Sequence, residues 1–184
     1  MTVTINNLEP ATGTEITFNA AHRMLHQGKV VQTQTVTSHV RTTFSAPNSG
    51  NGTQITQLNL TITPWRADST IWLRWTVAYE MHHDTSFVVQ RDGSLIGYNL
   101  DIGNTRWSNI VTPQYDADYS TTPQVSTINW FDVAGSTAAR TYQLCVRSSG
   151  GSNWTFALNR SLNGAGTDGQ EVGVSHGIAR EICG

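Results

Sequence analysis

The residues best suited to metal binding are two adjacent histidines followed by an acid, His82-His83-Asp84. In an extended segment adjacent side chains point to opposite sides, so the two imidazoles of one chain are not expected to share an ion. Three copies around a symmetry axis could supply three imidazoles, and a solvated loop between strands is the simpler interpretation. Asp168 and Glu171 offer oxygen ligands for calcium, but two carboxylates in one loop are too few. The sequence therefore predicts no metal site within one chain.

Three further patterns resemble catalytic or cofactor motifs by their letters. Gly164-x-Gly166-x-x-Gly169 matches a dinucleotide fingerprint, but no helix is expected after it to hold a pyrophosphate, so we interpret it as a surface loop. Ser175-His176 has no nearby acid that would complete a nucleophile and base. The acids available for a glycosidase pair lie in loop-like contexts: Asp116, Asp118, Asp132 and Glu171. We therefore predict that the chain is not an enzyme and binds no cofactor.

Aromatic side chains in loop-like segments are the strongest candidates for surface contacts. Exposed Trp and Tyr beside Asn, Asp and Gln suit stacking on sugar rings, and they suit packing between subunits equally well. The candidates are Trp65, Trp107, Tyr115 and Tyr119. By contrast, Trp75 and Trp154 lie on apolar stripes and are expected in the core.

Composition excludes several classes of partner. The chain has 184 residues, a net charge of -2 and 13% charged residues, with Lys29 as its single lysine. This length predicts one domain, and the charge gives no basic surface for nucleic acid. Neither a signal peptide nor a membrane-spanning run is expected from the pattern of apolar residues. Weak electrostatic self-repulsion favours association of the chain with itself.

The elements that must carry these residues are strands. Alternating apolar residues predict strands at 30–37, 58–62, 125–133, 142–147 and 153–159, and a longest strand from Thr70 to Met81. Asp92-Gly93 predicts a tight hairpin turn. A short helix is expected at 19–28, and 100–119 is expected to be irregular apart from anchoring apolar residues. Many short strands with almost no helix predict an all-β fold, an antiparallel β-sandwich of jelly-roll type with a short N-terminal extension.

The two cysteines, Cys145 and Cys183, lie opposite the apolar stripes of their strands. They could meet in a disulfide, whereas a cytosolic protein would keep them reduced. Both alternatives remain open at this point.

Four short motifs occur in a characteristic order: Gly28-Lys29-Val30-Val31-Gln32, Leu60-Thr61-Ile62-Thr63-Pro64, Gln90-Arg91-Asp92-Gly93-Ser94 and Thr155-Phe156-Ala157-Leu158-Asn159-Arg160-Ser161, with a terminal Glu181-Ile182. Residues 28–184 thereby resemble the jelly-roll domains, with a C1q/TNF-like topology, of tailed-bacteriophage tail-fibre and virion-decoration proteins. The segment from Thr4 to Thr14 is similar to the shaft-like repeats that precede such heads. The long loop from Pro113 to Pro123 and the final Cys183-Gly184 depart from the pattern.

The resemblance implies a homotrimer without cofactor or catalysis. Residues 1–28 would be an attachment or shaft-like arm and residues 29–184 the jelly-roll head. The expected function is a virion surface protein, made in the host cytoplasm, that decorates or cements the capsid and contacts major capsid or tail proteins. The alternatives are a tail-fibre or spike component that contacts host surface glycans, and a free-standing carbohydrate-binding module. No nucleic acid or membrane partner is expected.

Overall fold

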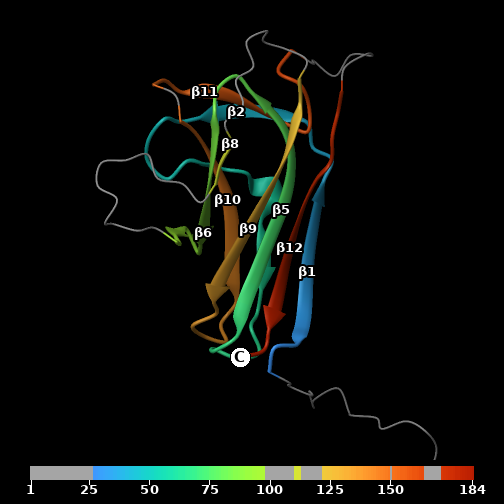
Figure 1. The fold of residues 1–184 in the computed structure, drawn as a ribbon, viewed down its shortest axis with the longest axis vertical. Helices are drawn as coiled ribbons and strands as arrows, with labels where there is room; N and C mark the ends of the chain where they lie inside the picture. The colour runs from blue at the N-terminus through green and yellow to red at the C-terminus, as the bar shows by residue number, and fades with distance from the viewer. Residues whose placement is uncertain (1–26, 98–109, 113–121, 150, 164–170) are drawn as a thin grey trace, which may run out of the picture.

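A computed structural model describes residues 27–97, 110–112, 122–149, 151–163 and 171–184 (Figure 1). Within these residues the chain forms strands and one short 3-10 helix, η1 (Thr56–Leu58). The strands are β1 (Val30–Ser38), β2 (Thr42–Ala46), β3 (Thr53–Gln54), β4 (Leu60–Ile62), β5 (Thr70–Met81), β6 (Thr85–Arg91), β7 (Ser94–Leu95), β8 (Ile110–Thr112), β9 (Gln124–Val133), β10 (Arg140–Ser148), β11 (Trp154–Leu158) and β12 (Ser175–Ile182). The arm predicted at 1–28 and the helix predicted at 19–28 lie outside the described residues, except for 27 and 28.

The strands form two antiparallel sheets packed face to face (Figure 1). In sheet A the order is β1-β12-β5-β11-β2, and β9 pairs with the free edge of β5. In sheet B the order is β3-β10-β6-β7, with β4 on β10 and β8 on β6. The chain passes repeatedly from one sheet to the other, as in a jelly roll, so the predicted antiparallel β-sandwich is confirmed.

Strand β5 is the central element of sheet A, and its sequence explains why. Alternate residues from Ile71 to Tyr79 are fully buried between the sheets, as their spacing predicts. The ring of Tyr79 stacks on Phe156 of β11 at a centroid distance of 5.0 Å and meets Phe87 of β6 edge-on at 5.4 Å. Aromatic rings from both sheets therefore interlock at the centre of the sandwich.

The hairpin between β6 and β7 follows the predicted turn chemistry. Asp92 and Gly93 have φ angles of 52° and 81°, the pair of positive values that a type I′ turn requires. Glycine supplies the second of these at no steric cost, because it has no Cβ. The predicted Asp-Gly hairpin is therefore confirmed in position.

Strand β12 is paired on both sides, between β1 and β5, and its larger apolar residues do not face the core. Ala179 is buried in the core, whereas Ile178 and Ile182 are only half-buried on the opposite face. A Cβ on Gly177 would lie 2.7 Å from Trp75 Cδ1, so small residues on the inner face of β12 make room for that indole. The larger aliphatic residues of β12 therefore face outwards.

This orientation also corrects the placement of one cysteine. Cys183 shares the side of Ala179 and Glu181, opposite Ile178 and Ile182 as its sequence suggested, but this side faces inwards rather than away from the core. Cys145 lies between the core residues Leu144 and Val146 on the outer face of sheet B, as predicted. Both thiols are buried and free, so the described structure contains no bond between them.

Candidate functional site

The outer face of sheet A carries exposed apolar side chains along its edge strand β9. Val125, Phe131 and Val133 are 66%, 60% and 60% exposed, although each lies in a regular strand. Odd-numbered residues of β9 face solvent, while Ile128 is buried in the core and Trp130 packs against it. This strand therefore has two apolar faces, one of them in water. An antiparallel strand with one solvated face ordinarily carries polar residues there.

One aromatic ring and two arginines continue this exposed face onto β5 and β12. Trp72 lies opposite Phe131 in the β5–β9 register, and the two rings stack with centroids 6.1 Å apart. The Arg180 guanidinium carbon lies 5.1 Å from the Trp72 ring, within the range of a cation–π contact. Arg74 and Ile178 complete a shallow hollow with Trp72 and Arg180. We call the set Trp72, Arg74, Val125, Phe131, Val133, Ile178 and Arg180 the sheet-A face.

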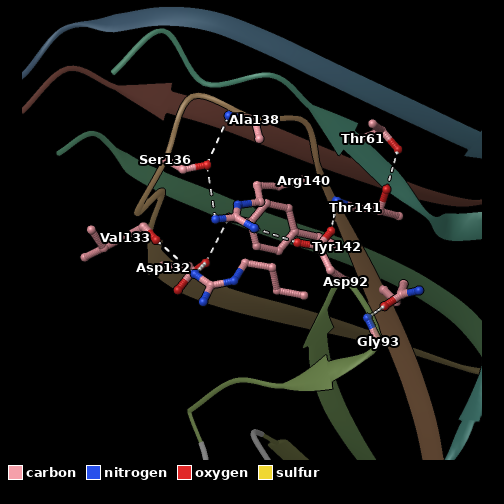
Figure 2. Close-up of polar contacts among 12 residues, drawn as sticks. Thr61, Asp92, Gly93, Asp132, Val133, Ser136, Ala138, Arg140, Thr141 and Tyr142 are labelled. Atoms are coloured by element: carbon pink, nitrogen blue, oxygen red, sulfur yellow. Dashed lines mark hydrogen bonds and ion pairs between the residues drawn. The ribbon is translucent and has the colours of Figure 1, made fainter. Parts of the chain in front are cut away.

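Strand β9 has no charge on this face that would discourage pairing with another chain. Its single charged residue, Asp132, points inwards and accepts hydrogen bonds from Arg91 Nη1 at 2.8 Å and from the Tyr142 hydroxyl at 2.9 Å (Figure 2). Burial, together with the negative charge of Asp132, raises the pKa of Tyr142. Among the described strands, β9 pairs only with β5, so no described strand covers its other edge. Natural proteins commonly protect such an edge with lysine, proline or an outward charge.

The predicted contact residue Trp65 lies elsewhere, at the end of the sandwich where β12 finishes. Its side chain is half-buried, and its backbone N–H donates to Glu181 Oε1 at 2.8 Å. The backbone N–H of Arg66 donates to the same oxygen at 3.1 Å, and Gln32 Nε2 donates to Glu181 Oε2 and to the carbonyl of Thr63. Trp65 is therefore held through its backbone in a polar cluster around Glu181. We call this cluster, formed by Gln32, Thr63, Trp65, Arg66 and Glu181, the bracket. The other predicted contact residues, Trp107, Tyr115 and Tyr119, lie outside the described residues.

The bracket gives a structural reason for several motifs of the sequence. Gln32, Thr63 and Glu181 come from three motifs that are far apart in the chain, and Gln32 Nε2 donates both to the carbonyl of Thr63 and to the carboxylate of Glu181. In a fourth motif, Asn159 has a φ of 56°, and its Nδ2 donates to the carbonyls of Ser38 and Val40 at 3.0 Å each. These residues hold strands and corners together. They are not grouped around a cavity or a reactive centre.

The two adjacent histidines do not point apart, so the prediction that their side chains lie on opposite sides is wrong. Residues 82–84 form a bend after β5 rather than an extended strand. The rings of His82 and His83 have centroids 5.8 Å apart, and they contact Trp154 with centroid distances of 5.0 and 4.3 Å. Within the described residues, no group of three or more His, Cys, Asp or Glu side chains could hold a metal ion.

The remaining motif residues either have structural partners or fall outside the described part of the chain. Ser175 Oγ donates to Asn159 Oδ1 at 2.6 Å and accepts from the backbone N–H of Ala78 at 2.9 Å, so this hydroxyl is held as a structural group. His176 and Glu171 are exposed. The glycine pattern at 164–169, with Asp168, and the acids Asp116 and Asp118 lie outside the described residues.

Sequence reasoning missed the sheet-A face, although a signal was present. Trp72 lies on the same side of β5 as Arg74 and Thr76, which is the polar side of the strand. A tryptophan on that side must lie on the outer face of the sheet. In β9, Phe131 alternates with Val125 and Val133 on one side, while Ile128 lies on the other. Apolar residues on both sides of one strand are thus a signal, readable from the sequence, of an exposed apolar surface.

Searches with known family models and with curated proteins returned no match to this chain. No helix among the described residues is long and apolar enough to span a membrane.

Proposed function

We propose that this chain is a non-enzymatic structural protein that associates with itself through the sheet-A face, forming a homotrimeric surface appendage of a bacteriophage virion. The observation that carries the proposal is the exposed row of Val125, Phe131 and Val133 on an unprotected edge strand, continued by Trp72. Burial of such apolar area is the main driving force of association.

A second copy of the chain is the occupant that the composition favours. With 13% charged residues and a net charge of -2, two copies repel each other only weakly. The same strand in each copy could cover the apolar face of its neighbour around a rotation axis, which leaves no open row of apolar residues. The number three, and the virion itself, come from the resemblance of the ordered motifs to phage appendage domains.

The position of Gly28 supports attachment of the head at one end of the sandwich. The backbone N–H of Gly28 donates to the carbonyl of Cys183 at 2.7 Å, so the residue where the proposed arm meets the head lies beside the end of β12. An arm attached there would leave the other end of the sandwich pointing outwards. Decoration or cementing of the capsid is the favoured role, with major capsid proteins as partners, and tail attachment is the alternative.

Two measurements test the proposal. Sedimentation velocity of the purified chain over a dilution series should show a trimer that dissociates reversibly, and a monomer at every concentration would overturn the self-association. Antibody labelling of phage particles that carry this protein should place it on the capsid for decoration and on the tail for a fibre. Absence of label from intact particles would contradict both placements.

A further inference from the structure

A second surface feature lies at the end of the sandwich that is remote from Gly28 and Cys183. A pocket of about 290 Å³ is lined by His82, Trp154, Thr155, Leu162 and Asn163. His82 follows β5, Trp154 and Thr155 begin β11, and Leu162 and Asn163 come after β11. Figure 1 shows β11 at the opposite end of the sandwich from the C-terminus. Strand β5 alone separates the two ends by about 35 Å, at roughly 3.3 Å per residue.

An indole held in place forms the apolar part of this pocket. Trp154 is half-buried, packs against the core and is flanked by the rings of His82 and His83. Its Nε1 atom is buried, and no described residue accepts its hydrogen. This N–H is out of reach of a ligand, so what Trp154 offers the pocket is the fixed apolar surface of its ring.

The rest of the lining supplies neutral polar groups. Asn163 and Thr155 are exposed and offer an amide and a hydroxyl, and His82 offers an imidazole. The backbone N–H of Leu162 donates to the buried carboxylate of Glu80, which fixes the segment that carries Asn163. None of the five lining residues is an acid, a lysine or an arginine.

We propose that this pocket binds one or two rings of a neutral saccharide. The C–H face of a pyranose suits stacking on the indole of Trp154, and its hydroxyls both donate and accept hydrogen bonds with Asn163, Thr155 and His82. An anionic ligand would meet no lysine or arginine in the lining, and a purely apolar one would leave the polar groups unpaired. The volume is close to the lower limit of about 300 Å³ for small-molecule pockets, which suits a mono- or disaccharide. As the outward end of an attached appendage, and in this respect the inference rests on the proposed function, the pocket would contact a surface glycan.

Titration of the ¹⁵N-labelled chain with glucose, galactose, mannose, N-acetylglucosamine and rhamnose tests this directly. The chain has six tryptophans, and the indole N–H signal that disappears in Trp154→Phe identifies Trp154. That signal should move saturably with at least one of these sugars, while the signal assigned by Trp72→Phe stays in place. Galacturonic acid, the anionic counterpart of galactose, should bind more weakly. If none of the neutral sugars moves the Trp154 signal up to molar concentration, the proposal is overturned.

Two exposed polar residues test the geometry without disturbing the core. Asn163→Ala and Thr155→Val should each weaken sugar binding about 3- to 10-fold, the loss expected for one hydrogen bond. Thr137→Val, at an exposed threonine in the bend between β9 and β10, is the matched control for Thr155→Val and should bind the sugar as the unaltered chain does. Unchanged affinity in both pocket variants would contradict the assigned contacts.

Sedimentation of the same variants separates this inference from the proposed function. A trimer that binds none of the sugars overturns the saccharide site alone. A monomer whose Trp154 signal still moves with a sugar overturns the self-association and leaves the pocket as a carbohydrate-binding site.

Discussion

Replacing Phe131 by serine perturbs the sheet-A face most directly. Phe131 is 60% exposed. An aromatic side chain presents about 200 Å² in total, so about 120 Å² of it is free to be covered by another copy. At about 25 cal/mol per Å², covering this area stabilises an interface by about 3 kcal/mol per subunit.

The trimer contains this residue three times, so formation of the trimer becomes about 9 kcal/mol less favourable in the variant. The concentration of half-dissociation follows the square root of the trimer dissociation constant, and it therefore rises about 1,600-fold. If the neighbouring subunit covers only half of the exposed ring, the expected rise is about 40-fold.

Sedimentation velocity over a dilution series measures this shift, with thermal unfolding of the same variant as a check on the fold. Within one chain, the substitution removes the stack of Phe131 on Trp72, whose ring centroids are 6.1 Å apart. Such a pair contributes about 0.5–1.5 kcal/mol, so the monomer should stay folded. Val40→Ser alters a valine that is 50% exposed and lies outside β9, and it should leave association unchanged. If Phe131→Ser dissociates at the same concentration as the unaltered chain, the sheet-A face is not the interface.

Three further predictions concern the stability of the fold and the accessibility of a buried thiol. Burial alone would raise the pKa of Glu181, but hydrogen bonds from Gln32 and from the backbone of Trp65 and Arg66 outweigh it and lower that pKa. The carboxylate therefore stabilises the fold above the ordinary glutamate range and loses this contribution as pH falls through its lowered value. Urea titrations should show Glu181→Gln about 2 kcal/mol less stable at neutral pH, with a smaller loss on acidification; equal pH profiles would contradict the bracket. Gly177→Ala should cost about 1–3 kcal/mol, because its Cβ would lie 2.7 Å from Trp75 Cδ1, whereas Gly151→Ala meets no atom within 4 Å and should be neutral. Burial raises the pKa of Cys145 to about 12, so iodoacetamide at pH 8 should modify this thiol only after denaturation, and rapid labelling of the native chain would contradict its burial.

Much of the fold could be predicted because strand alternation and turn chemistry are local. The bounds of β5 agree with the expected Thr70–Met81, and the Asp92-Gly93 turn joins β6 to β7 as its residue types require. The inner and outer faces of β12 could not be assigned in the same way. They depend on the bulk of Trp75 in the neighbouring strand, which excludes a side chain at Gly177, and no property of the β12 sequence alone contains that information.

The candidate surfaces were harder to predict, because each one depends on where along a strand the alternating apolar residues cease to be buried. Trp154 continues the stripe of Phe156 and Leu158, so alternation predicts a core residue, yet it lies at the end of the sandwich where the stripe reaches the pocket. The bend after Met81 brings the rings of His82 and His83 onto this indole. Alternation describes a strand and says nothing about where a strand leaves the core.

The motif residues whose contacts are described have structural roles. Gln32, Thr63 and Glu181 meet in the bracket at one end of the sandwich, and Asn159 holds the backbone of Ser38 and Val40. These contacts hold the fold together and involve neither proposed surface. The proposed interface on the sheet-A face and the proposed saccharide site in the Trp154 pocket use none of these residues, and they lie on separate parts of the molecule. Association and ligand binding should therefore respond to separate substitutions.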